Sequence, residues 1–319
     1  MRKVSIVVPC YNEEENIEDF YNVVTKVIES EKSNYELIFI DDGSKDNTRK
    51  ILKKLKSGKN YEIKSLIFSR NFGKEAAMYA GLKESNGDYV CIIDADLQQD
   101  PKYILQMQKT LEENEDCDSI ALYQKQRNES SVLKVFKHAF YKLINKMAEV
   151  EFVSGASDFR MFKRNMVDAI IEISEKNRFS KGIFSWVGFN TYYLPYSANE
   201  RNKGNSKWSF WKLFKYAISG IVSFSTAPLR FSTIIGLILS FVSLLYLIMV
   251  IIQKLIWGIA IPGYATIVVL ILLLGGIQLL SIGIIGEYLA RTYIETKNRP
   301  IYVLKEKVVK EKSNKKEPM

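Results

Sequence analysis

Two carboxylates follow a short apolar run in the segment CIIDADLQQDP, which spans residues 91–101. They belong to Asp94 and Asp96, and Gln98 offers a further oxygen two residues on. Such donors can hold a divalent cation together with a diphosphate, because Mg²⁺ takes one or two carboxylates plus phosphate oxygens. A solvated turn would have a similar composition. The position directly after a buried strand favours the cation, so we predict a metal site at these three residues.

The composition narrows the chemistry that such a site can perform. The chain has 319 residues, a formal net charge of +9, one histidine and three cysteines without a CxxC spacing. A site built from several histidines is excluded. Neither a disulfide framework nor a zinc site is indicated, which fits a reducing compartment. Any metal would have oxygen ligands, so Mg²⁺ or Mn²⁺ is the expected cofactor.

Three further polar segments follow apolar runs: PCYNEE, DDGS and SRNFGKEAA. Tyr11 can pack on a nucleotide base, and Glu13 and Asp41 can bond a base or a ribose. Lys74 suits a diphosphate. Each segment also has a simpler interpretation, as a helix N-terminus, a turn that includes Asp42, or an ion pair with nearby carboxylates. The first loop lacks GxGxxG, which argues against a Rossmann dehydrogenase.

Strand-like and helix-like patterns alternate through the first 113 residues. The alternation predicts an α/β fold with a mostly parallel, doubly wound sheet. In such sheets ligands bind beyond the carboxyl ends of the strands. All four polar segments fall at those ends and should meet on one edge. The expected strands are 4–9, 37–40, 66–68 and 89–93, and the expected helices are 12–30, 73–85 and 101–113.

Two long uncharged stretches near the C-terminus indicate a hairpin of transmembrane helices. Residues 231–252 carry no charge and would span about 33 Å as a helix, enough for a bilayer. A second span is expected at about 262–286. Lysines and arginines flank the pair on its outer ends, so the positive-inside rule puts both ends in the cytoplasm. Buried core helices are rarely this long and free of charge.

These patterns give four predicted regions. Residues 1–205 form a cytoplasmic catalytic domain, and its N-terminal apolar run is too short for a signal peptide. Residues 206–229 form interfacial amphipathic helices on the inner leaflet, or a helix docked on the catalytic domain. Residues 230–290 hold the two spans. Residues 291–319 form a basic, solvated tail. Within the first region, 131–150 is predicted as a basic amphipathic helix and 190–196 as a strand.

The order and spacing of several motifs resemble the family-2 glycosyltransferases with the GT-A nucleotide-sugar transferase fold. The resemblance is strongest to the polyprenyl-phosphate glycosyltransferase group, which includes dolichyl-phosphate mannose synthase and bacterial undecaprenyl-phosphate glucosyltransferases with two C-terminal spans. It covers nearly the whole chain. The motifs are VVPCYNEEENI, DDGSKDNT, SRNFGKEAAMYAGL, DADLQQDP, SDFRMFKR, ERNKGNSKW and GEYLARTYIETKNRP.

The resemblance implies roles for individual residues. Asp96 is the main metal ligand and a catalytic residue, with Asp94 and Gln98 beside it. Asp158 and Arg160 lie near the reacting centre. The residues that bind the nucleotide sugar are Pro9, Tyr11, Glu13, Asp41, Asp42, Lys74 and Asp94. The residues that receive the acceptor phosphate are Arg127, Ser131 and Ser206. The residues of a loop that closes over the diphosphate are Arg201, Ser206 and Lys207, of which Arg201 and Lys207 count as catalytic.

The expected acceptor, a lipid monophosphate, needs no strong general base. Its second pKa is about 6, so it is already largely ionised in the cytoplasm. Catalysis then consists mainly of positioning and charge stabilisation. Attack opposite the leaving diphosphate inverts the anomeric centre. Asp158 therefore need not be a base. It can instead orient Arg160 or bond a sugar hydroxyl, and we favour orientation.

The predicted function is inverting transfer of one hexose from a nucleotide sugar to undecaprenyl phosphate at the inner membrane face, for modification of cell-envelope glycans. UDP-glucose is the favoured donor, with UDP-N-acetylglucosamine and GDP-mannose as alternatives. A processive polysaccharide synthase would need more spans and a QxxRW segment. A non-catalytic nucleotide-sugar sensor is disfavoured by the intact aspartates. We expect membrane lipid as a partner, no nucleic acid, and a homo-oligomer, since Gly275, Gly276 and Gly283 permit close packing of spans.

Overall fold

A computed structural model describes residues 2–124, 145, 150, 153, 155–196, 220, 222–257 and 263–312. Its described strands form a single eight-stranded sheet in the order β7-β5-β6-β4-β1-β2-β3-β8. Four of them, β1 (Lys3–Cys10), β2 (Asn34–Asp41), β3 (Tyr61–Phe68) and β4 (Tyr89–Ile92), run parallel to their neighbours within this group. This confirms the predicted α/β fold with a mostly parallel sheet, and each predicted strand in this half coincides with an observed one.

Helices cover both faces of the parallel strands because successive side chains point to opposite faces. Ile6 and Val8 of β1 lie in one core cluster, which also contains residues of α1 (Ile17–Glu29) and α4 (Tyr103–Glu113). Val7 lies in the second cluster with residues of α3 (Lys74–Glu84). A short helix, α2 (Thr48–Lys54), follows β2. The parallel strands are thus held between two apolar layers, which fixes where their carboxyl ends lie.

The side of the sheet next to β4 is antiparallel. Strand β6 (Ala156–Lys163) lies between β4 and β5 (Ser119–Gln124) and runs antiparallel to both. Strand β7 (Thr191–Tyr196), which the sequence predicted, is added parallel to β5. Two helices follow β6, namely α6 (Arg164–Glu172) and α7 (Ser180–Trp186). The sequence did not predict β5, β6 or these two helices. The predicted helix at 131–150 lies almost wholly outside the described residues.

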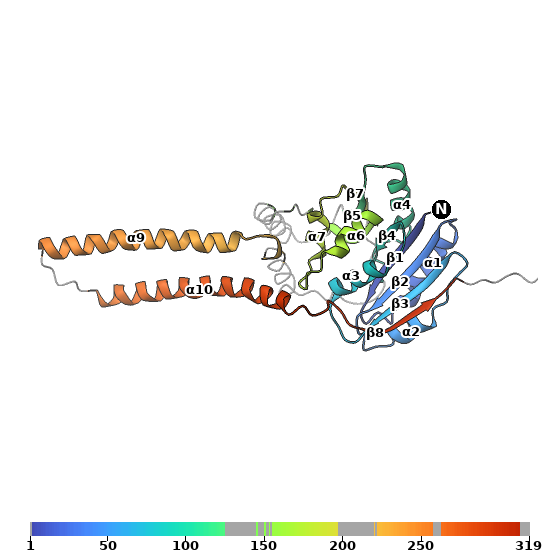
Figure 1. The fold of residues 1–319 in the computed structure, drawn as a ribbon, viewed down its shortest axis with the longest axis horizontal. Coiled ribbons are helices and arrows are strands. Elements are labelled where there is room, and N and C mark those ends of the chain that lie inside the picture. The colour runs from blue at the N-terminus through green and yellow to red at the C-terminus, as the bar shows by residue number, and fades with distance from the viewer. Residues whose placement is uncertain are drawn as a thin grey trace, which may run out of the picture.

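The expectation of a solvated tail after residue 290 is wrong for its middle part. Residues Leu304–Lys310 form β8, which pairs antiparallel with β3 (Figure 1). Lys307 pairs with Glu84 at 2.7 Å, and Lys53 pairs with Glu306 at 2.7 Å. Just before the strand, the ring of Tyr302 stacks on Phe68 with the ring centroids 5.0 Å apart. The catalytic sheet therefore includes a strand that follows both long apolar stretches in the chain.

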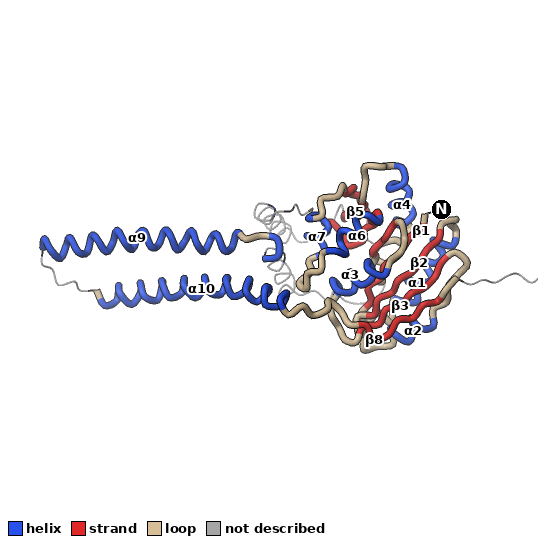
Figure 2. The backbone as a smooth tube through the Cα atoms, viewed as in Figure 1, coloured by secondary structure: helices blue, strands red, loops and turns tan. Residues whose placement is uncertain are grey.

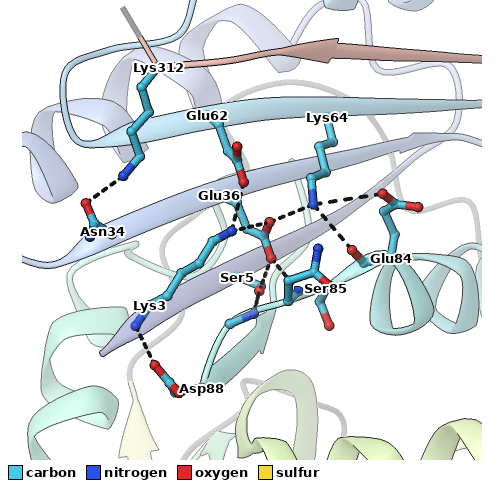
Figure 3. A network of polar contacts seen from close by, with 12 residues as sticks. Lys3, Ser5, Asn34, Glu36, Glu62, Lys64, Glu84, Ser85, Asp88 and Lys312 are labelled. Atoms are coloured by element: carbon cyan, nitrogen blue, oxygen red, sulfur yellow. Dashed lines mark hydrogen bonds and ion pairs between the residues drawn. The ribbon is translucent and has the colours of Figure 1, made fainter. Parts of the chain in front are cut away.

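A buried ionic network joins the amino-terminal ends of the parallel strands (Figure 3). The carboxylate of Glu36 is fully buried and accepts hydrogen bonds from Lys64 Nζ at 2.8 Å and from the backbone N–H of Asn86 at 2.6 Å. Lys3 Nζ lies 3.0 Å from the same carboxylate, and the hydroxyl of Ser5 also donates to it. These contacts satisfy a charge that would be costly to bury alone. They lie at the opposite ends of the strands from the predicted site.

Two long helices, α9 (Ala227–Trp257) and α10 (Tyr264–Thr296), project together from the sheet domain (Figure 2). Within the described residues they give two candidate membrane spans, Ala227–Gln253 and Val269–Thr296, with mean hydropathies of 2.8 and 2.4. None of either hydropathic window is buried, which fits lipid-facing helices and not core helices. Helix α10 continues beyond the predicted span end at 286. Most of the predicted interfacial segment, 206–219, lies outside the described residues.

Candidate active site

The metal-site residues predicted from the sequence form a tight turn after β4. Ile93 is fully buried and its N–H still donates to the carbonyl of Val7 at 3.0 Å. Beyond it the chain leaves the sheet. The Asp96 carboxylate accepts the N–H of Gln98 at 3.2 Å, and Leu97 between them has a φ of 54°. An aspartate that bonds the N–H two residues on stabilises such a turn. The turn leaves Asp94 about one third exposed, at 34 %.

Lys74 joins two carboxylates from different strands. Its Nζ lies 2.8 Å from both carboxylate oxygens of Asp94 and 2.8 Å from Oδ2 of Asp158. The strand register explains this meeting, because Ile92 of β4 pairs with Arg160 of the antiparallel strand β6. Continuing that register by two residues brings Asp94 opposite Asp158. Lys74 is the first residue of α3 and places a positive charge between the two negative ones.

These contacts fix the charge states of Lys74 and Asp158. Burial alone would raise the pKa of Asp158, but the charges of Lys74 and Lys181 outweigh it and hold the pKa below its usual range. Burial would likewise lower the pKa of Lys74, but Asp94 and Asp158 outweigh it and raise the pKa. Asp158 is therefore a carboxylate at neutral pH and a weak proton acceptor. This favours an orienting role over that of a general base.

Arg160 lies two residues beyond Asp158 on the same strand and is almost fully buried, at 3 % exposed. Its Nε donates to the carbonyl of Ser157 at 3.1 Å. Its guanidinium carbon lies 5.1 Å from the ring centroid of Phe184 in α7. The SDFR motif thus supplies a carboxylate and a guanidinium that are both held by neighbouring groups.

The two aspartates at the end of β2 are held by the surrounding loops. Asp41 accepts the N–H of Ser44 at 2.9 Å and Nε of Arg49 at 3.1 Å. Asp42 accepts the N–H groups of Phe72 at 2.6 Å and Gly73 at 2.9 Å. Burial raises the pKa of Asp42, and these two hydrogen bonds offset part of the rise. Asp42 therefore fastens the loop that leads into Lys74.

The loop after β1 reaches the same edge of the sheet. Pro9 is the second-last residue of β1. Tyr11, the first residue after the strand, is 36 % exposed. The N–H of Glu13 donates to Oγ1 of Thr48 at 2.8 Å, and its carboxylate accepts Nδ2 of Asn16 at 2.7 Å. The exposed ring of Tyr11 is available to a flat partner such as a base. The structure thus brings the polar segments after β1, β2 and β4 together with Lys74.

Five of the predicted site residues lie outside the described residues: Arg127, Ser131, Arg201, Ser206 and Lys207. Their predicted roles in binding the acceptor phosphate and covering the diphosphate stay predictions. Two charged groups near Asp158 were missed by sequence reasoning. Lys181 Nζ lies 4.0 Å from Oδ1 of Asp158 and donates to the carbonyl of Ala156 at 3.1 Å. Glu75 bonds Ser180 at the start of α7. No local motif marks Lys181, because α7 meets the site only through packing, and Glu75 lies within SRNFGKEAA but was given no role there.

A cavity of about 250 Å³ lies between the catalytic domain and the long helices. Ile183 and Trp186 of α7 line one side, and Phe224 and Thr226, just before α9, line another. Tyr288 of α10 completes the wall and donates its hydroxyl to the carbonyl of Ser225 at 2.6 Å. Its lining is mixed, with Glu175 and Ser223 beside the apolar residues, and it involves Ile183 and Trp186 of α7 and not Lys181, which contacts Asp158.

The site therefore lies at one edge of a mixed, mostly parallel sheet, with an acidic turn directly after β4. Residues 5–171 match Glycosyl transferase family 2, and residues 227–292 match the GtrB C-terminal hairpin. The chain therefore belongs to glycosyl transferase family 2, with a hairpin of the GtrB type after the catalytic domain.

Two relatives match over nearly their full length. The chain is 41% identical over 304 residues to the prophage bactoprenol glucosyl transferase homolog of Escherichia coli K12, covering 95% of this chain and 98% of the relative. It is 42% identical to the SfII prophage-derived bactoprenol glucosyl transferase of Shigella flexneri, covering 95% and 97%. Among solved structures, glucosyl-3-phosphoglycerate synthase from Mycobacterium tuberculosis gives a TM-score of 0.45 at 19% identity, covering 69% of this chain and 78% of that chain. That last likeness is too low to bear on the chemistry of this chain.

Proposed function

We propose that this protein transfers one glucose unit from UDP-glucose to a polyprenyl phosphate at the inner face of the membrane. The observation that carries the proposal is the similarity to proteins named bactoprenol glucosyl transferase, bactoprenol being a polyprenol. It extends over 304 residues and includes the hairpin as well as the catalytic domain. A relative that shared only the catalytic domain would say nothing of a lipid acceptor.

The proposed reaction is a single displacement. An oxygen of the acceptor phosphate attacks C1 of the glucose, a C1–O bond to that phosphate forms, and the C1–O bond to the β-phosphate of UDP breaks. UDP leaves with the bonding electron pair, and the configuration at C1 inverts. The acceptor is already ionised, so no proton has to be removed. The lowered pKa of Asp158 is consistent with this, because a carboxylate with that pKa would accept a proton poorly.

The site residues divide between the two substrates. Tyr11 packs on the base, and Lys74 and Arg160 are the cations proposed to lie near the anionic groups. In the structure the ammonium of Lys74 is paired with Asp94 and Asp158, and Arg160 is almost fully buried. Charge stabilisation of this kind is strongest when the donor groups are already fixed. The further residues of the nucleoside side are Pro9, Glu13, Asp41 and Asp42. The residues proposed for the acceptor phosphate are Arg127, Ser131 and Ser206, and Arg201 and Lys207 close over the diphosphate.

A divalent cation fits the donor set at the end of β4. Within the described residues, no three His, Cys, Asp or Glu side chains group to form a complete metal site. Mg²⁺ and similar ions do not need one, because they bind through one or two carboxylates together with substrate phosphates. Asp94, Asp96 and Gln98 would hold the ion. When bound, it would neutralise charge on the departing diphosphate.

The long helices explain how a lipid substrate reaches the site. A polyprenyl chain stays in the bilayer, so only its phosphate is presented at the surface. The basic residues that flank the hairpin favour the cytoplasmic surface by the positive-inside rule. The cavity between α7 and Tyr288, with Ile183 and Phe224 in its wall, would suit an apolar chain that follows the phosphate. A homo-oligomer through the small residues of α10 stays a prediction.

The proposal is tested by incubating the purified full chain in detergent with undecaprenyl phosphate and Mg²⁺. UDP-glucose, UDP-N-acetylglucosamine and GDP-mannose are supplied in separate labelled reactions, each with and without EDTA. Asp96→Asn removes a proposed ligand. Asp100→Asn is the matched control, because Asp100 lies in the same segment but bonds the N–H of Lys102 and is partly exposed.

We expect label in the organic phase with UDP-glucose alone, lost with EDTA and in Asp96→Asn and retained in Asp100→Asn. Transfer from one of the other donors would correct the sugar but keep the reaction. Lipid-linked label that persists undiminished in EDTA and in Asp96→Asn would overturn the metal site. Nucleotide binding without any transfer would favour the alternative hypothesis of a non-catalytic nucleotide-sugar sensor.

A further inference from the structure

Helix α7 contacts both charged residues of the SDFR motif. Lys181, its second residue, lies 4.0 Å from Oδ1 of Asp158 and donates to the carbonyl of Ala156 at 3.1 Å. One turn further on, the ring of Phe184 lies under the guanidinium of Arg160, with 5.1 Å from the guanidinium carbon to the ring centroid. The position of α7 therefore decides what surrounds Asp158 and Arg160.

The amino-terminal end of α7 is capped by a residue from another helix. The residue before the helix is Phe179, which has no side-chain oxygen to accept the first N–H groups. Helix ends leave such groups without intrahelical partners, and a carboxylate nearby is favourable to them. Glu75 Oε2 accepts the N–H of Ser180 at 2.9 Å, and it also accepts the hydroxyl of Ser180. Glu75 thus supplies the cap that the local sequence lacks.

Glu75 directly follows Lys74 in the first turn of α3. One residue bridges Asp94 and Asp158, and the next holds the helix that contacts Asp158 and Arg160 from the other side. The first turn of α3 therefore makes both connections. The connection through Lys74 ends at Asp158 of β6, and the connection through α7 ends at Asp158 and Arg160 of the same strand.

A role as the charge partner of Arg178 is the simpler alternative for Glu75. The guanidinium of Arg178 is buried, lies 4.5 Å from the ring centroid of Tyr79, and donates to the carbonyls of Ile170 and Ile173. The two hydrogen bonds of Glu75 go to Ser180 instead. Burial lowers the pKa of Arg178 and Glu75 is the largest of the charges that raise it, but the hydrogen bonds of Arg178 go to backbone carbonyls and those of Glu75 go to the first residue of α7.

We propose that Glu75 is a positioning residue for the transfer reaction: it caps α7 and so holds Lys181 and Phe184 against Asp158 and Arg160. The inference rests on the proposed function, because it assumes that the SDFR residues act in sugar transfer. Glu75 need not touch either substrate. Its effect should appear in the rate of the chemical step and not in the affinity for the donor.

The test compares Glu75→Ala, Glu75→Gln and a control, Glu84→Ala, in the full-length chain. Glu84 is the last residue of the same helix and also forms an ion pair with another element, Lys307 at 2.7 Å, away from the site. For each variant, kcat and KM for the donor are measured together with the thermal unfolding midpoint. Hydrogen exchange of the 180–186 amides is recorded in parallel.

We expect Glu75→Ala to lower kcat by about 10²-fold, the order that a displacement of 1 Å can cost, with KM changed far less. Glu75→Gln retains an oxygen that can accept from Ser180 and should recover most of kcat. Exchange at 180–186 should rise in Glu75→Ala only. Glu84→Ala should lower the unfolding midpoint and leave kcat unchanged.

An unchanged kcat in Glu75→Ala would overturn the proposal, and so would a loss matched by Glu84→Ala at equal destabilisation. If the wild-type chain transfers no sugar, the proposed function fails. The cap is then judged by hydrogen exchange alone: faster exchange at 180–186 in Glu75→Ala supports it, and unchanged exchange overturns it.

Discussion

Nζ of Lys74 lies 2.8 Å from Oδ2 of Asp158, so the first turn of α3 is tied to the strand next to β4. The same ammonium also contacts Asp94 at 2.8 Å. The ammonium thereby offsets the repulsion between the like charges of Asp94 and Asp158. An anionic diphosphate that approaches Lys74 meets a cation whose position is already fixed.

Replacing Lys74 with methionine should abolish most of the transfer activity. Asp94 would then lose its ion pair with Lys74, Asp158 would keep Lys181 at 4.0 Å, and the donor diphosphate would lose a fixed cation. We expect kcat/KM to fall by roughly 10²–10³-fold, as when one preorganised donor is removed. The side chain is 40% exposed, so the unfolding free energy should change by less than about 1 kcal/mol. Kinetics and thermal unfolding measure the two effects. Lys74→Arg is the control that keeps the charge, and activity within threefold of wild type in Lys74→Met would contradict the prediction.

The buried network around Glu36 should make stability depend on pH. Burial alone would raise the pKa of Glu36, but hydrogen bonds from Asn86, Lys64, Ser5 and Lys3 outweigh it and hold the pKa well below the ordinary 4.5. The group therefore stabilises the fold fully above about pH 4.5, and this contribution is lost as the pH falls below that value. Denaturant unfolding of the full chain in detergent between pH 3 and pH 7 measures it.

Glu36→Gln should remove this part of the pH dependence and cost about 3 kcal/mol of unfolding free energy at pH 7, because the buried Lys64 loses its charge partner at 2.8 Å and keeps the more distant Glu84 at 3.9 Å. Glu62→Gln is the control, since Glu62 is partly exposed and pairs only with Lys3 in the network of Figure 3. An equal loss of unfolding free energy in Glu36→Gln and Glu62→Gln would contradict the prediction, because it would show that the cost does not depend on the burial of Glu36.

Tyr302 should contribute strongly to the attachment of β8. Its ring stacks on Phe68 and lies 6.4 Å from the ring of Tyr79. Tyr302→Ala removes both contacts and should cost about 2 kcal/mol. It should also speed hydrogen exchange at 304–310. Tyr302→Phe keeps the ring and should behave as wild type. Unchanged exchange in Tyr302→Ala would mean that the strand pairing alone holds β8.

Gly73 has a backbone conformation that residues with a side chain rarely adopt, with φ at 99° and ψ at 158°. A Cβ at this position would meet no atom within 4 Å, so packing does not require the glycine. Gly73→Ala should nevertheless destabilise the protein by about 1–3 kcal/mol through backbone strain. It should also disturb Lys74, the next residue. Thermal unfolding of Gly73→Ala and wild type tests this, and equal stability of the two would contradict it.

The sequence was sufficient to predict the strands whose ends build the site. Apolar runs followed by polar segments marked β1, β2, β3 and β4, and the rule for parallel sheets then placed Lys74 and Asp94 on one edge. Asp158 was assigned by resemblance alone, because nothing in SDFRMFK distinguishes a strand that runs antiparallel beside β4.

The elements that were missed depend on contacts between distant residues. Strand β8 has the sequence LKEKVVK, which has the composition of a solvated basic tail. Its charges are used in pairs such as Lys53 with Glu306, which lie far apart in the chain. The link from Glu75 to Ser180 is likewise invisible in a single sequence, since each residue alone is an ordinary polar group on a short helix.

The place of β8 in the chain also sets an order of synthesis. Its partner β3 ends at Phe68, whereas β8 begins at Leu304, after both α9 and α10. On the ribosome, the outer edge of β3 therefore stays unpaired until the whole hairpin has been made. An open strand edge is a site for wrong pairing with other chains. A chain released between residues 257 and 304 would carry the first helix of the hairpin and a sheet whose β3 edge is unpaired. The sheet is therefore completed only after the hairpin has been synthesised.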